Sequence, residues 1–239
     1  MNISSTPVNN DMKISPLHAL LGPCLRGAVF VALVTGIAYP LAVTGVAQLL
    51  LPAQASGSLI QQGSTVVGSR LIGQDFREAR YFHPRPSSTL AADPVDSSKR
   101  VASPYNAGAS AGSNQGPTNA ALIEAVQQRV KDYRATNGLP ADASVPVDAV
   151  TASASGLDPH ISVANAQLQM DRVANARHLP LAQVQSLLAQ HTEGRLLGLL
   201  GEPRVNVLLL NLALDEHMLP DAAGAEAAHV NHGGEHHVR

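Results

Sequence analysis

A polar run in the middle of the chain has the residue types that nucleophilic catalysis uses. Ser153 and Ser155 lie close in sequence to Asp158 and His160. A hydroxyl nucleophile, an imidazole base and a carboxylate are the three parts of a hydrolytic triad. The run lacks a GxSxG pattern, however, and the members of a triad are normally far apart in sequence. We therefore expect Asp158 and the proline after it to form a turn that leads into a helix capped by Ser162.

Histidines are the other candidates for chemistry. His83, His160 and His191 lack the HExxH spacing, so they can share a metal ion only if the fold brings them together. We expect His191 to complement the dipole at the C-terminal end of a helix instead. The tail, residues 216–239, is rich in His, Ala and Gly. We expect it to be disordered, although a His-rich tract can also bind transition metals.

Several kinds of site are excluded by what the chain lacks. It has no GxxxxGK[ST] phosphate-binding loop, and its only cysteine is Cys24. A disulfide framework, a cysteine-based zinc site and CxxC redox chemistry are therefore excluded. The net charge is −2 and no basic run is longer than Lys99-Arg100, which gives no reason to expect a nucleic-acid partner. We predict no metal site and no cofactor of the chain's own.

One long apolar segment near the N-terminus determines where the rest of the chain lies. Residues 27–51 are mostly aliphatic or small, and none of them is charged. As a helix they would be about 37 Å long, against a hydrocarbon core of roughly 30 Å, so they predict one transmembrane helix. Pro40 is tolerated in such a helix. Lys13 and Arg26 precede the segment, and the first basic residue after it is Arg70.

This charge bias predicts that residues 1–26 are cytoplasmic and that residues 52–215 form an extracytoplasmic domain. A cleaved signal peptide is the alternative, because Ala53-Gln54-Ala55 offers a cleavage site, but the apolar segment is about twice as long as the core of a signal peptide. Small residues at Ala28, Ala32 and Gly36 lie four apart on one face of the helix. They predict a strip where another membrane helix can pack closely.

The soluble part indicates an α+β domain. Residues 52–57 read as a linker, and residues 84–117 are rich in Pro, Ser, Gly, Ala and Asn, which is typical of a long loop. Helices follow the strands rather than alternate with them, which favours α+β over a βαβ repeat. The pattern predicts short strands within 59–82, helices from 118 or 119 to 136, from about 162 and from 180, and a buried strand over 205–214.

These segments contain the motifs YFHPRP at 81–86, GSN at 112–114, GPTN at 116–119, TASASGLDPHIS at 151–162, RVA at 172–174, HTEGR at 191–195 and GEPRVNV at 201–207. Together the motifs closely resemble the C subunit of the bacterial Kdp potassium-transporting ATPase. The resemblance spans residues 27–215. Pro84 stands where the family's YFHxRP motif leads us to expect glycine, and Ala111 and Gln115 are further departures.

The resemblance implies a non-catalytic accessory subunit of the bacterial inner membrane, with one span and a periplasmic domain. Its implied partners are a K+-binding, channel-like subunit, a P-type ATPase subunit that carries the hydrolytic site, and a small accessory peptide. The family is described as holding this complex together and as raising the affinity of the ATPase subunit for ATP. Gln169 matches a family glutamine that has been linked to nucleotide contact.

The predicted topology conflicts with direct nucleotide contact, because ATP is cytoplasmic whereas Gln169 follows the span. ATP affinity would then change only by coupling through the span and the partner subunits. Two alternatives from other classes stay open. One is a membrane-anchored envelope hydrolase that uses His160 and Asp158, and the other is a secreted metal-binding protein that uses the His-rich tail.

Overall fold

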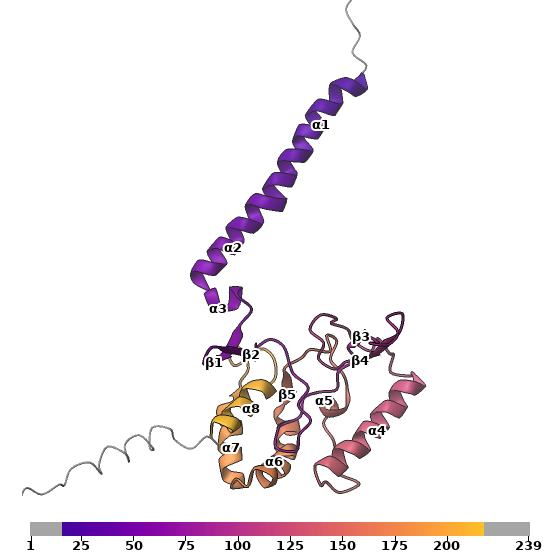
Figure 1. The fold of residues 1–239 in the computed structure, drawn as a ribbon, viewed down its shortest axis with the longest axis vertical. Helices are drawn as coiled ribbons and strands as arrows, with labels where there is room; N and C mark the ends of the chain where they lie inside the picture. The colour runs from indigo at the N-terminus through magenta and orange to yellow at the C-terminus, as the bar shows by residue number, and fades with distance from the viewer. Residues whose placement is uncertain (1–15, 218–239) are drawn as a thin grey trace, which may run out of the picture. The chain divides into compact units, whose positions relative to one another are not determined.

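The computed structural model describes residues 16–217 of the 239-residue chain. The chain divides into two compact units, residues 1–57 and 58–239, and each is described by itself. The predicted tail lies outside the described residues except for positions 216 and 217. Figure 1 shows the elements of both units.

The N-terminal unit is a long apolar helix. It consists of α1 (Pro16–Leu33), the π-helical turn η1 (Val34–Ala38) and α2 (Tyr39–Leu50), followed by the single turn α3 (Pro52–Ala55). By length and composition, Leu20–Leu50 is the one candidate membrane span in the described part of the chain, and its side chains are unburied. The predicted helix is confirmed, but it begins well before residue 27. The predicted linker contains a helical turn.

The π-helical turn lies directly before Pro40, and the ring of proline gives the reason. Pro40 has no N–H to donate, and its ring would meet the carbonyl group four residues earlier, that of Gly36. A wider turn moves that carbonyl group out of the way, and such local adjustments are how membrane helices accommodate proline. The segment Tyr39–Leu50 then continues as a regular α-helix.

The second unit is a mixed domain with small antiparallel sheets. Strands β1 (Leu59–Gln62) and β2 (Thr65–Ser69) pair as a hairpin, and β5 (His160–Ser162), β7 (Arg204–Asn206) and β6 (Thr192–Glu193) form a three-stranded sheet in that order. The α+β class is therefore confirmed. The predicted long loop contains a hairpin that the sequence did not indicate, β3 (Leu90–Ala92) with β4 (Arg100–Ala102).

Between residues 58 and 217 the domain also has five helices: α4 (Ala120–Thr136), α5 (Val147–Val150), α6 (Val163–Arg177), α7 (Leu181–Gln190) and α8 (Val207–Glu216). The predicted helix starts are confirmed for α4 and α6, because the side chains of Asn119 and Ser162 accept hydrogen bonds from their first turns. In Figure 1, α6, α7 and α8 lie together beside β5, and α4 lies apart from them.

The hydrophobic core lies among these three helices, the sheet and the segment around Phe82, which has no regular secondary structure. Phe82 is fully buried in it, far in sequence from its neighbours. The predicted strand over residues 205–214 is wrong, since only β7 is extended and α8 follows at once. Leu210 and Leu214 are buried at helical spacing, and Asn206 caps the helix by accepting a hydrogen bond from the Leu209 N–H.

Candidate functional site

Residues 79–83 form a turn followed by a stretch without regular secondary structure, and side chains of α6 and α8 bind its backbone. The Phe82 N–H donates to Oδ1 of Asn211 at 2.8 Å, and Nδ2 of Asn211 donates to the Phe82 carbonyl group at 3.0 Å. In the same way, the His83 N–H donates to Oε1 of Gln169 at 2.7 Å, and Nε2 of Gln169 donates to the His83 carbonyl group at 3.2 Å. Each side-chain amide thus pairs with both backbone groups of one residue, as the opposite residue of an antiparallel strand would.

Gln169 makes four hydrogen bonds in all. Besides its bonds to His83, its Nε2 donates to Oδ1 of Asn165 at 2.8 Å, and its Oε1 accepts from Nη2 of Arg172 at 2.7 Å. A side-chain amide has two N–H donors and one oxygen with two lone pairs, so the capacity of Gln169 is filled. The residue is 1% exposed. It is therefore a buried part of the fold and not a helix-surface glutamine.

Two arginines of α6 add charge-assisted bonds to this arrangement. Arg172 donates to the Tyr81 carbonyl group and to Oδ1 of Asn137, both at 2.9 Å. Burial lowers the pKa of Arg172 to about 10, which leaves the guanidinium charged at neutral pH. Arg177 donates to Oδ1 of Asp215 at 2.8 Å, and its guanidinium carbon lies 5.0 Å from the centre of the Tyr81 ring.

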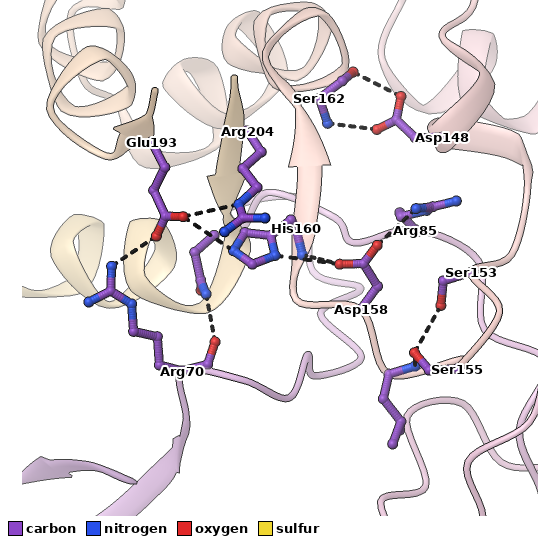
Figure 2. A network of polar contacts seen from close by, with 12 residues as sticks. Arg70, Arg85, Asp148, Ser153, Ser155, Asp158, His160, Ser162, Glu193 and Arg204 are labelled. Atoms are coloured by element: carbon purple, nitrogen blue, oxygen red, sulfur yellow. Dashed lines mark hydrogen bonds and ion pairs between the residues drawn. The ribbon is translucent and has the colours of Figure 1, made fainter. Parts of the chain in front are cut away.

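Two residues of the hydrolase hypothesis, Asp158 and His160, do lie side by side, and Glu193 lies on the other side of the His160 ring (Figure 2). Its Nδ1 lies 3.5 Å from Oδ1 of Asp158, and its Nε2 lies 3.7 Å from Oε2 of Glu193. The imidazole ring therefore lies between the carboxylate of Asp158, in the turn before β5, and that of Glu193, in β6. Both distances exceed those of good hydrogen bonds, so the ring is an electrostatic neighbour of each carboxylate.

Arginines neutralise both carboxylates. Arg85 donates to Asp158 at 2.8 Å, whereas Arg70 and Arg204 donate to Glu193 at 2.8 and 3.1 Å (Figure 2). Burial by itself would raise the pKa of Asp158, but the nearby His160 ring, the hydrogen bond from the His160 backbone N–H at 3.0 Å and the Arg85 guanidinium hold that pKa below its usual range. The hydrogen bond from Arg70 lowers the pKa of Glu193 against the effect of burial. Neither carboxyl group is thus prepared to act as a general acid at neutral pH.

The serines of the polar run are committed to a turn. The Oγ atoms of Ser153 and Ser155 accept hydrogen bonds from the backbone N–H groups of Gly156 and Leu157, at 2.9 and 3.1 Å. Within the described part of the chain, no hydrogen bond joins either serine to His160. A nucleophile has to lie within hydrogen-bond reach of its base, so the geometry does not assemble a triad.

The predicted cap at Ser162 is present, although β5 separates it from the Asp158 turn. The Oγ of Ser162 accepts from the Asn165 N–H at 3.1 Å. Asp148 accepts from both the backbone N–H and the hydroxyl group of Ser162, each at 2.8 Å. The polar run thus serves to start α6.

A cleft of about 380 Å³ lies between the loop after residue 82 and α4. Burial lowers the pKa of His83 at its wall, and the charge of Arg172 adds to this, so the ring is neutral at pH 7. Nε of Arg85 is buried without a hydrogen-bond partner at the same wall. The charged side chains that line the cleft are Asp75, Arg77, Arg85, Arg129 and Asp132.

The other predicted site residues are placed as follows. Ala28 and Ala32 lie in α1, whereas Gly36 lies inside the π-helical turn. A Cβ atom added at Gly36 would meet nothing within 4 Å, so this face of the helix is open within the chain. Packing of another helix on the strip stays a prediction.

The histidines have separate surroundings. His191 follows the last residue of α7, and its Nδ1 lies 2.9 Å from the Leu187 carbonyl oxygen, at the predicted helix end. Among the described residues, no group of three or more His, Cys, Asp or Glu side chains is arranged to hold a metal ion. His83, His160 and His191 are thus not brought together as one site.

Sequence reasoning missed Asn211 and Arg177 as organising residues. A signal was present, because Asn165, Gln169, Val173 and Arg177 recur every four residues and all lie on the buried face of α6. Three polar residues on the inward stripe of a helix require buried partners. Gln169 bonds to the His83 backbone, Arg177 bonds to the Arg80 carbonyl group and to the C-terminal end of α8, and Asn165 bonds to Asp148 and Tyr133.

Comparisons with known proteins give a consistent result. The family model described as KdpC, K+-transporting ATPase, c chain, matches residues 21–216. A potassium-transporting ATPase KdpC subunit of Bradyrhizobium diazoefficiens is 57% identical over 195 residues, which cover 80% of this chain and 96% of the relative. Subunits of the same name from Methylobacterium nodulans and Rhodopseudomonas palustris are 56% and 58% identical, over 82% and 81% of this chain and 96% of each relative.

Proposed function

Because the chain belongs to the KdpC family of K+-transporting ATPase subunits, we propose that it stabilises the assembly of a K+-binding, channel-like subunit with a P-type ATPase subunit. In this proposal it is an accessory subunit without chemistry of its own, and a small peptide completes the complex. It lies in the bacterial inner membrane with a cytoplasmic N-terminus and a periplasmic domain. The positions of Lys13, Arg26 and Arg70 support this orientation.

The observation that carries the proposal is that the amides, carboxylates and serine hydroxyls of the candidate site form hydrogen bonds and ion pairs within the domain. Gln169 and Asn211 form hydrogen bonds with backbone groups, and the carboxylates of Asp158 and Glu193 pair with arginines. The serines accept hydrogen bonds within their own turn. An enzyme instead keeps a nucleophile and a base poised toward a substrate. This favours a rigid body that presents a surface over a catalyst, and so counts against the envelope hydrolase.

An effect on ATP affinity belongs to the same proposal. Direct contact by Gln169 would require at least one of its four internal hydrogen bonds to break. With the domain in the periplasm, coupling through the span and the partner subunits is the remaining route to the cytoplasmic nucleotide. The metal-binding alternative depends on the His-rich tail, which lies outside the described residues.

The small-residue strip gives the sharpest test of assembly. Gly36→Leu should push a neighbouring helix away, because membrane helix contacts rely on close packing that added apolar bulk does not restore. Gly45→Leu is the matched control. It adds the same bulk in α2 about half a helical turn away from the strip, and a Cβ atom there also meets nothing within 4 Å.

We expect Gly36→Leu to lower both the yield of intact complex in detergent and the K+-stimulated ATPase activity, with turnover per intact complex unchanged. Gly45→Leu should leave both near the wild-type level. His160→Ala should reduce activity only as far as it unfolds the domain. If His160→Ala leaves assembly whole but abolishes turnover, the accessory role is wrong and the polar network acts in the reaction.

A further inference from the structure

The loop between β6 and β7 exposes four leucines at the tip of a tight hairpin. Leu196 and Leu200 exchange backbone hydrogen bonds of 2.8 and 3.0 Å, and Leu197 and Gly198 form the turn with φ of +54° and +74°. We call residues 195–201 the leucine hairpin. A leucine at positive φ is a strained conformation, so the backbone is held in a defined shape at some cost.

The exposure of this hairpin is unusual for a soluble surface. Its leucines, at positions 196, 197, 199 and 200, are 67%, 86%, 81% and 63% exposed. Scattered exposed leucines are normal, but a contiguous group indicates an interaction site. No charged residue lies between Arg195 and Glu202, which pair with each other at 2.8 Å at the base of the hairpin.

The base of the hairpin is tied to the start of the domain. The Arg70 N–H donates to the Ser58 carbonyl group at 3.0 Å, and the Arg70 side chain donates to Glu193 at 2.8 Å, as Figure 2 shows for the side-chain bond. Glu193 lies in β6, two residues before the hairpin begins. The base of the hairpin is therefore linked through Arg70 to Ser58, the first residue of the domain.

The length of the connection keeps this point near the bilayer. Residues 51–58 join α2 to β1, and eight residues reach at most about 28 Å even when fully extended. A folded unit of about 160 residues has a radius of gyration of roughly 15 Å, so the connection is no longer than the domain is wide. Some part of the domain around Ser58 must then lie close to the lipid surface if the apolar helix spans the membrane.

We propose that the leucine hairpin inserts into the interfacial region of the lipid bilayer, as a second membrane contact that fixes the orientation of the domain. Its four side chains are pure hydrocarbon, which suits acyl chains, whereas protein hot spots favour Trp, Tyr and Arg over Leu. Arg70, Arg195 and Arg204 surround its base and are about half exposed, where they can meet lipid phosphate groups.

The test uses the full chain in vesicles of phosphatidylcholine and phosphatidylglycerol. In a Cys24→Ser background, Leu197→Cys carries an environment-sensitive fluorophore, and Val95→Cys, where Val95 is 94% exposed in another hairpin, is the matched control. One quencher is a phosphatidylcholine with a nitroxide near its glycerol end, because interfacial segments insert only roughly 5–10 Å. Iodide is the aqueous quencher, and the Val95 site reports the fraction of domains that face the outside.

We expect the probe at position 197 to be blue-shifted, quenched by the nitroxide lipid and protected from iodide, with the reverse at position 95. Replacing Leu196, Leu199 and Leu200 together by Asn should abolish lipid quenching at 197 while circular dichroism stays unchanged. A probe at 197 that iodide quenches and the nitroxide lipid does not would overturn the proposal. So would protection from both quenchers in the assembled complex alone, because a protein subunit would then cover the hairpin.

Discussion

Gln169 and Asn211 show how single side chains can take the place of a β-strand. The segment that contains Phe82 belongs to no sheet, yet its backbone groups at Phe82 are buried and need partners. Each amide supplies one donor and one acceptor to the same residue. A net contribution of about 0.5–1.5 kcal/mol for each bond is modest, but leaving the buried groups unsatisfied costs more.

Replacement of Gln169 by leucine should therefore destabilise the domain by about 2–4 kcal/mol, because the His83 backbone and the Arg172 guanidinium both lose a buried partner. Gln167→Leu makes the same chemical change at an exposed position of the same helix and should change stability little. Urea unfolding followed by circular dichroism measures both.

A second measurement separates this structural role from nucleotide contact. If Gln169→Leu folds as stably as the wild-type protein while the assembled ATPase loses affinity for ATP, the glutamine acts on nucleotide and our interpretation of its bonds is wrong. If stability falls and the remaining intact complex has the wild-type ATP affinity, the glutamine is structural.

The burial of Gln169 could not be predicted from the sequence. Its family position was visible from the RVA motif, but a single glutamine on a helix is most often exposed. The partner that buries it, the backbone of His83, lies 86 residues away in the sequence. Backbone groups leave no mark in the sequence, so only the spacing of Asn165, Gln169 and Arg177 could have indicated an inward polar stripe.

At the scale of elements, helix ends were the most predictable features. Asn119 and Ser162 cap α4 and α6 because a short polar side chain can reach the free N–H groups of the first turn. The end of α6 is different. His178 closes it in the left-handed region, with φ of +56° and ψ of +34°, a position that usually belongs to glycine.

We expect His178→Gly to stabilise the domain by about 0.5–1 kcal/mol. The substitution relieves the strain of a Cβ atom at positive φ, and this gain exceeds the cost of the greater conformational freedom of glycine in the unfolded chain. The backbone bond from the Leu179 N–H to the Ala174 carbonyl group should remain. His178→Ala is the control, because it removes the imidazole ring but keeps the Cβ atom. Urea midpoints compare the three proteins, and an equal gain in both variants would assign the effect to the ring.

The wrongly predicted strand over residues 205–214 had a physical cause. Two β-branched residues and a run of leucines fit a buried strand as well as a buried helix, because neither alternation nor a polar face is present. The side chain of Asn206 favours the helix, because it caps the first turn of α8. The β3–β4 hairpin was missed for the opposite reason, because its short strands, such as Leu90–Ala92, are poor in β-branched residues.

At the scale of the whole molecule, the division into an apolar helix and an α+β domain could be predicted, because it depends on long patterns that average over many residues. The predicted helix began too late because the segment before residue 27 contains Arg26, although a single arginine near the end of a span can reach the interface. The side of the membrane on which the domain lies depends on only two positive charges, so it needs a direct measurement.

We predict that the domain is periplasmic, and cysteine labelling in spheroplasts can test this. In a Cys24→Ser background, Val95→Cys places a thiol at a position that is 94% exposed, and Ser5→Cys places one before the helix. A membrane-impermeant maleimide should label Val95→Cys in intact spheroplasts and Ser5→Cys only after lysis, because Lys13 and Arg26 keep the N-terminus inside. The reverse pattern would put the domain in the cytoplasm, and Gln169 and the cleft beside it would then be open to direct contact with ATP. The expected pattern confines any effect on ATP affinity to coupling through the span and the partner subunits, because the domain and the nucleotide would then lie on opposite sides of the membrane.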